Sequence, residues 1–152
     1  MHILAGVVIV LFLLSILFEV SIFITNNCIA DSIEKALVKY ELPTDTVLVD
    51  STSIAGRVMG NGNGMMYLGS ILVKTDLSKE ELQEYYSRDF DIVEIRRQNS
   101  ESMPENADCY NFEYFSDMEV NTYYSINCWD SKRNEKFGDF ISDLLDLDIR
   151  GH

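Results

Sequence analysis

The sequence predicts an α+β fold in which an N-terminal transmembrane helix continues into an amphipathic stem helix, followed by a small, mostly antiparallel sheet with two further helices. Three observations support this class: a long apolar opening segment, helical periodicity directly after it, and a remainder that alternates β-prone runs with helical patterns. With 152 residues, 47% hydrophobic and 24% charged, we expect one folded domain after the membrane segment. The expected parts are an anchor over residues 1–25, a stem helix over 26–43 and an α+β domain over 44–152.

The opening segment carries no charge from Ile3 to Phe18 and stays apolar as far as Ile24, with Glu19 as its one ionisable residue. A helix over residues 3–24 is about 33 Å long, enough to cross the roughly 30 Å hydrocarbon layer. A helix that packs on a protein core with one side needs only an apolar stripe on that side. A helix that is apolar all round is therefore better solvated by lipid. Glu19 lies near the end of the span, where its side chain reaches the interface, although ionisable groups in a bilayer also mark partner helices.

A cleaved secretory signal is the alternative interpretation, because the sequence from Cys28 to Ala30 has the small residues that cleavage requires. No Lys or Arg precedes the apolar run, however, and the run exceeds the roughly 7 to 15 residues of a signal core, which favours an uncleaved anchor. Lys35 and Lys39 after the span favour a cytoplasmic domain, whereas an apolar segment at the start is typical of exported chains. We expect a single-pass protein of the cell membrane with its domain outside the cytoplasm.

The stem helix is predicted from apolar residues at helical spacing, and Pro43 lies beyond its end. These apolar residues are Ile29, Ile33, Ala36, Leu37 and Tyr40. Short β-prone runs follow it along the chain. They cover Thr46 to Val49, Ile54 to Met59, Met65 to Thr75 and Phe90 to Arg96.

A helix is predicted to begin at Ser78 and to end near Asp89. Ser78 can cap the first turn while Glu81 bonds back to the Ser78 amide, and Leu77 can pack against Leu82 across that turn.

The last third of the chain predicts a surface loop, a hairpin and a terminal helix. The polar stretch 98–108 is the loop, and the runs Cys109 to Phe115 and Val120 to Cys128 form the hairpin. Apolar residues from Phe137 to Leu145 recur at helical spacing, so we expect a helix whose apolar side faces the core.

A glycine-rich run, Gly60, Asn61, Gly62, Asn63 and Gly64, invites comparison with phosphate-binding loops. The pattern fails that comparison because the third glycine of a dinucleotide fingerprint and the Lys-Ser/Thr of a P-loop are both absent. We interpret the run as a hairpin connection with positive φ angles and, if it has a function, as a ligand-contacting loop.

Two cysteines of the predicted hairpin, Cys109 and Cys128, fall on one face at its open end, within reach of a disulfide after a small adjustment. Two buried free thiols are the alternative, and export favours the bond because it persists only in an oxidising compartment. Cys28 is left without a partner.

The aromatic residues of the hairpin are mostly core residues, but one group can remain partly exposed as a contact surface. Tyr114 and Tyr123 belong to that group, and we expect their replacement by Ser to weaken binding of a partner without unfolding the domain.

Charge and composition narrow the function classes. Twenty-five acidic against twelve basic residues leave a net charge of −13, which disfavours nucleic acid as a partner. The two histidines, His2 and His152, lie at the chain ends. The interior of the domain therefore has no histidine for a metal site or a catalytic triad. We expect no enzyme, no cofactor and no metal. An acid-dependent hydrolase is a further hypothesis, resting only on the abundance of carboxylates.

The plan of an apolar N-terminal helix, an amphipathic stem and a sheet resembles type IV pilins and pseudopilins. Only the outline is similar, because no basic, glycine-ended leader precedes Ile3 and Glu19 lies far inside the apolar segment. The resemblance implies the alternative function, a structural or assembly subunit that self-associates through its apolar helix. The first hypothesis is a membrane-anchored acidic domain that binds a protein partner or ligand without chemistry of its own.

Overall fold

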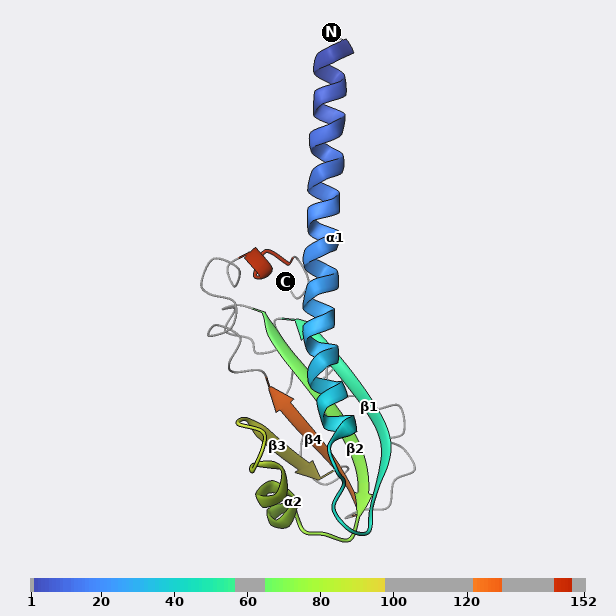
Figure 1. Cartoon of the computed structure of the whole chain (residues 1–152), viewed down its shortest axis with the longest axis vertical. Helices are drawn as coiled ribbons and strands as arrows, with labels where there is room; N and C mark the ends of the chain where they lie inside the picture. The colour runs from blue at the N-terminus through green and yellow to red at the C-terminus, as the bar shows by residue number, and fades with distance from the viewer. Residues whose placement is uncertain (1, 57–64, 98–121, 130–143, 149–152) are drawn as a thin grey trace.

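The computed structural model describes residues 2–56, 65–97, 122–129 and 144–148. A single long helix packs one half of its length against a four-stranded antiparallel sheet, and a second helix lies at the far end of that sheet (Figure 1). The elements in chain order are α1 His2–Lys39, β1 Thr46–Gly56, β2 Met66–Thr75, α2 Lys79–Tyr86, β3 Val93–Arg97 and β4 Tyr123–Trp129. The predicted α+β class is therefore confirmed.

Helix α1 runs without interruption through 38 residues, about 57 Å, and so joins the predicted span and stem in one element. Its N-terminal half projects alone, and its C-terminal half crosses the sheet (Figure 1). Of the predicted apolar stripe, Leu37 is buried and Ile29, Ile33 and Tyr40 pack against the core, whereas Ala36 is exposed. The buried side of the helix also begins earlier than predicted, because Ile22, Asn26 and Ala30 are buried as well.

The sheet has the strand order β1-β2-β4-β3, with every neighbouring pair antiparallel. Strand β2 matches its prediction, whereas β1 continues through Asp50–Ser53, where a gap between two short strands was expected. The gap was wrong because the hydroxyls of Ser51 and Ser53 bond to carboxylates of α1, which compensates for their low β-propensity. The register shifts between Leu48 and Asp50, so β1 carries a bulge.

Strand β4 lies inside the sheet and pairs along both of its edges. Tyr124 to Cys128 face β3 on one side, and the whole strand faces β2 on the other. The predicted hairpin between 109–115 and 120–128 is therefore wrong for β4, because neither edge is free for another strand. Sequence periodicity identified the strand but could not identify its neighbours, which are distant along the chain.

The core lies between the sheet and the two helices. Leu37 of α1 and Leu82 and Tyr86 of α2 pack against the sheet face that carries Ile71 and Ile126. On the opposite face Leu68 and Leu72 are fully buried as well, and Ser70 Oγ donates to Asn127 Oδ1 at 2.5 Å. Both faces of the central strands are therefore covered, and this buried polar pair is satisfied.

Helix α2 begins as predicted, with Ser78 as its N-cap in a complete capping box. The Ser78 amide donates to the Glu81 carboxylate at 2.8 Å, and the Glu81 amide donates back to Ser78 Oγ at 3.3 Å. The Ser78 amide and the Ser78 hydroxyl both donate to the Glu81 carboxylate, and these two bonds lower the pKa of Glu81. The helix ends at Tyr86, earlier than the predicted end near Asp89.

A short turn over residues 144–148 lies beside the middle of α1 (Figure 1). Leu144 and Leu145 are helical, and Leu145 is buried. The remainder of the predicted terminal helix, before residue 144, lies outside the described residues.

Candidate functional site

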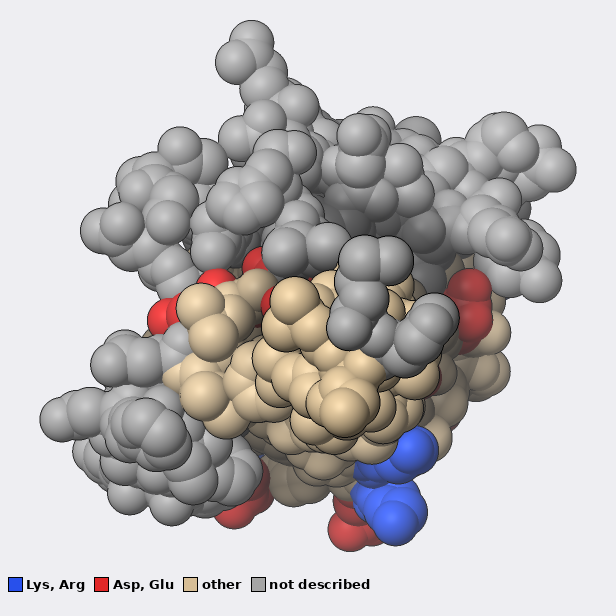
Figure 2. Space-filling model, turned by 90° about the horizontal axis from the view of Figure 1, so that it is seen from above, with Lys and Arg blue, Asp and Glu red and all other residues tan. Residues whose placement is uncertain are grey.

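The N-terminal half of α1 is bare. Every side chain from Ile3 to Ser21 is exposed, although nearly all of them are apolar. This run of roughly 19 residues is about 28 Å long, close to the thickness of the hydrocarbon layer of a bilayer. Viewed from above, along α1, the described atoms at the centre are neither acidic nor basic (Figure 2). Helix α1 is thus long and apolar enough to cross a membrane.

Protein contact with α1 begins at Ile22, which is 3% exposed. Asn26, Ala30 and Leu37 follow on the same side at intervals of one or two turns, and all three are buried. Phe23 and Ile24, on the other sides of the helix, are exposed. The boundary between the bare and the packed half is therefore one helical turn wide.

Asn26 is the centre of a buried polar cluster at this boundary, which we call the junction cluster: Asn26, Tyr67, Leu145 and Asp148. The Asn26 side-chain amide donates to Asp148 Oδ2 at 2.8 Å and to the Leu145 carbonyl at 3.2 Å. Its carbonyl oxygen accepts from the Tyr67 hydroxyl at 2.5 Å. One side chain of α1 thus joins the helix to β2 and to the C-terminal turn.

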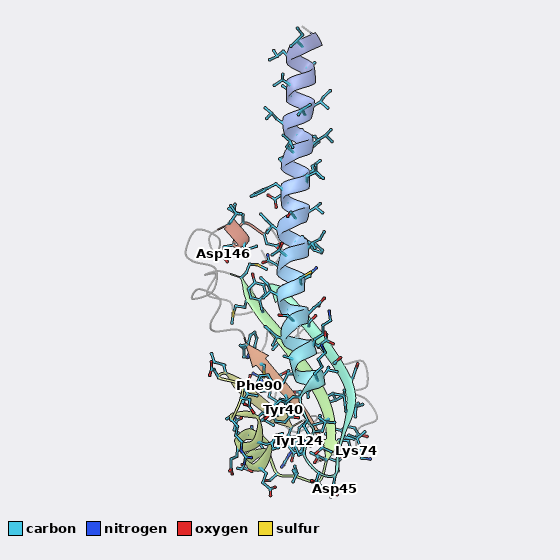
Figure 3. The ribbon with its side chains drawn as sticks, viewed as in Figure 1. Tyr40, Asp45, Lys74, Phe90, Tyr124 and Asp146 are labelled. Carbon is cyan, nitrogen blue, oxygen red and sulfur yellow. The ribbon has the colours of Figure 1, made fainter. Side chains whose placement is uncertain are left out.

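A second contact ties the same turn to the sheet. The amide of Met65, directly before β2, donates to Asp146 Oδ1 at 2.8 Å. Figure 3 shows Asp146 beside α1, at the end of the domain from which the bare half projects.

Carboxylates of α1 bind hydroxyls of β1 further along the helix. Ser51 Oγ donates to Glu34 Oε1, and Ser53 Oγ donates to Asp31 Oδ1, both at 2.5 Å. These acidic residues therefore hold the helix on the edge strand.

Gly69 of β2 allows the closest approach between α1 and the sheet. A Cβ atom at this position would lie 2.4 Å from the Glu34 nitrogen and 2.7 Å from the Ile33 carbonyl carbon. Both are backbone atoms, which cannot move aside as a flexible side chain can. Glycine is therefore required here for the helix to lie against β2.

An aromatic cluster closes the opposite end of the domain, where Figure 3 labels Tyr40 and Phe90. The Tyr40 ring lies 5.6 Å from Tyr85, 5.6 Å from Tyr86 and 5.2 Å from Phe90, between ring centroids. The Tyr40 hydroxyl donates to the Asp89 carboxylate, which raises the pKa of Tyr40 to about 12. These residues link the end of α1 to α2, and of them only Tyr40 was predicted from sequence to lie on an apolar stripe.

Of the predicted contact residues, the structure describes Tyr123 alone. Gly60 to Gly64 and Tyr114 lie outside the described residues, so their role in binding stays a prediction. Tyr123 is half-buried at the start of β4, and Lys74 Nζ lies 5.5 Å from its ring centroid.

Cys128 is a buried free thiol on the helix-covered face of the sheet, and burial raises its pKa to about 12. Cys109 lies outside the described residues, so the disulfide stays a prediction. Cys28 is exposed and free.

The part of the chain that the structure describes contains no group of three or more His, Cys, Asp or Glu side chains arranged to hold a metal ion. A hollow over the outer side of α2 is wide open to solvent and is lined by residues of this helix and its end, including Lys79, Gln83 and Ser87. It offers no enclosed surface for chemistry.

No known family model matches the chain, and neither the curated proteins nor the solved structures contain a significant match.

Proposed function

We propose that the chain is a single-pass membrane protein whose helix α1 both crosses the bilayer and forms part of the core of an acidic α+β domain. The carrying observation is the abrupt change along one helix, from exposed apolar side chains between Ile3 and Ser21 to a buried stripe from Ile22 onward. In water the bare half would expose a large apolar surface without compensation, whereas lipid solvates it. Glu19 lies within one turn of the boundary, near the interface.

The domain binds a protein partner or ligand next to the membrane and performs no chemistry of its own. Support for this role comes from the use of its polar side chains. Asp31 and Glu34 hold β1, Asn26 holds the C-terminal turn, and Asp89 holds Tyr40. Carboxylates that are committed to structural hydrogen bonds favour a binding module over an acid-dependent hydrolase.

The domain lies outside the cytoplasm in this proposal. Lys35 and Lys39 after the span do not exclude this orientation, because long domains cross the membrane largely regardless of their charge. Protease treatment of right-side-out vesicles tests the sidedness: the domain should be digested without detergent. Protection until the vesicles are lysed would place it in the cytoplasm.

Membrane insertion is tested by alkaline carbonate extraction of the full chain. The parent protein should stay in the membrane pellet. Leu11→Arg combined with Leu14→Arg should shift it toward the soluble fraction, because each charge near the helix centre costs about 2.5 to 3.5 kcal/mol of insertion free energy. Val38→Arg and Val47→Arg, at exposed apolar positions of the domain, serve as the matched control and should leave the pellet unchanged. Extraction of the parent protein would overturn the proposal.

Partner binding is tested at Tyr123, the described member of the predicted contact surface. Tyr123→Ser should reduce the yield of heterologous crosslinks in native membranes while the melting temperature of the domain is retained. Unchanged crosslinks would remove Tyr123 from the binding surface.

Self-association through α1 is the second candidate. It is favoured by the bareness of the helix around its whole circumference, including Gly6, where an added Cβ atom would have no neighbour within 4 Å. Cysteine crosslinking in membranes at positions near Glu19 distinguishes the two functions: a ladder of self-oligomers supports assembly, and heterologous products support partner binding.

A further inference from the structure

The C-terminal turn, residues 144–148, has the reverse of the polarity expected for a turn in water. The carboxylates of Asp146 and Asp148 are directed inward, to the Met65 amide and the Asn26 side chain, both at 2.8 Å. Leu147, between them, is 53% exposed. In an aqueous turn the carboxylates face solvent and the leucine is buried. The inward-directed acids beside an exposed leucine distinguish this turn from an ordinary surface turn, in which the acids are solvated.

The turn lies close to the end of the bare half of α1. Its hydrogen bonds to Asn26 fix it one helical turn after Ile22, where the bare half of α1 ends. At this level the helix itself exposes Phe23 and Ile24, at 44% and 54%. Figure 1 shows the turn beside α1, at the end of the domain toward the bare half. Leu147 is thus an exposed apolar side chain on a second element, at the level where α1 still exposes apolar residues.

We propose that the C-terminal turn is a second membrane contact, in which Leu147 inserts into the boundary between headgroups and acyl chains next to α1. The inference rests on the proposed function, because it requires the bare half of α1 to lie in lipid. Interfacial segments bury their apolar side about 5 to 10 Å deep at this boundary, which is within reach of a turn beside the end of the bare half.

The second contact has a geometric consequence for the domain. A single helix leaves the domain free to rotate about the helix axis, since apolar side chains occur on every side of the bare half. Leu147 lies on one side of α1 only, held there by the bonds of the turn to Asn26 and Met65. Insertion of Leu147 fixes the rotation of the domain about the axis of α1. The sheet then keeps one orientation relative to the membrane plane.

Tryptophan quenching by brominated lipid tests the contact. The full chain carries one tryptophan, so Trp129→Phe gives a silent background. In this background Leu147→Trp is compared with Val47→Trp, its matched control. Val47 is 61% exposed and pairs with Lys74 at the end of the sheet far from the bare half (Figure 3). Both variants are reconstituted into phosphatidylcholine vesicles brominated at the headgroup end of the acyl chains.

The quenched fraction should be at least about threefold larger for Leu147→Trp than for Val47→Trp. Equal quenching in the two variants overturns the inference. A second measurement needs no substitution: in nanodiscs with a nitroxide near the headgroups, the methyl resonances of Leu147 should broaden and those of Val47 should not. Equal broadening also overturns it.

Alkaline extraction of the same samples separates the two proposals. If the protein is extracted, the proposed membrane span fails and the contact of the turn fails with it. If the protein stays in the vesicles but the two tryptophans are quenched alike, only the inference about Leu147 fails.

Discussion

Replacing Asn26 by alanine tests how strongly the junction cluster holds the domain together. Asn26 is fully buried and makes three hydrogen bonds, to the Tyr67 hydroxyl, the Leu145 carbonyl and the Asp148 carboxylate. A neutral buried bond contributes about 1 kcal/mol net, and a bond to a carboxylate about 1.5 to 3 kcal/mol. Asn26→Ala should therefore lower the free energy of unfolding by about 3 to 5 kcal/mol.

Thermal unfolding in detergent micelles measures this loss, with the fluorescence of Trp129 as the signal. For a chain of this length each 1 kcal/mol lowers the melting temperature by about 2 to 4 °C, so a decrease of about 10 °C is expected. Hydrogen exchange should at the same time accelerate in residues 144–148, because the turn loses two of its bonds to α1.

Thr25→Ala is the matched control for this substitution. Thr25 is the preceding residue of the same helix and is exposed, and its hydroxyl donates to the Ser21 carbonyl within α1 at 2.8 Å. Its loss should change the stability by less than about 0.5 kcal/mol. If Asn26→Ala melts within about 2 °C of the parent protein, the junction cluster does not hold the turn, and the reasoning from its geometry is refuted.

Gly69→Ala should destabilise the domain by about 2 to 3 kcal/mol in urea titrations, since the new Cβ atom meets the backbone of α1. Gly6→Ala, where the new Cβ atom has no neighbour, should leave the stability of the domain unchanged. Equal unfolding midpoints for the two variants would contradict the close approach of α1 to β2. At pH 8 iodoacetamide should modify Cys28 and spare Cys128 in the folded chain, because the raised pKa of the buried Cys128 thiol leaves almost no thiolate until pH approaches about 12. Mass spectrometry of the peptides measures the modification of both cysteines. Rapid modification of Cys128 would show that its thiol is accessible. Tyr86→Phe should keep or slightly raise the melting temperature, since its buried hydroxyl has no hydrogen-bond partner among the described residues; a fall of several degrees would reveal a partner.

Local patterns predicted the elements well. The capping sequence after Leu77 predicted the start of α2 to the residue, and the apolar run to Thr75 predicted β2, because both depend on neighbours in the sequence. The continuity of α1 also follows from local residues, since no proline occurs before its end at Lys39.

Long-range partners were not predictable in the same way. Asn26 is a polar residue next to an apolar segment. Its structural role depends on a hydrogen bond to Asp148, more than a hundred residues later in the chain. Ser51 and Ser53 suggest a break in β1 until their bonds to α1 are known. The hairpin was wrong for the same reason, because β4 takes both of its neighbours from far earlier in the chain. A single sequence carries no record of such pairings.

Because α1 has no kink or break, a tilt of its bare half also tilts the domain packed on its other half. The packed half, from Ile22 to Lys39, is about 26 Å long and is continuous with the bare half, without a break in the helix. A tilt of about 20°, ordinary for a membrane helix, would swing the far end of the sheet sideways by about 9 Å. Bilayer thickness alone could thereby set how far the aromatic end of the domain reaches toward whatever lies beside it.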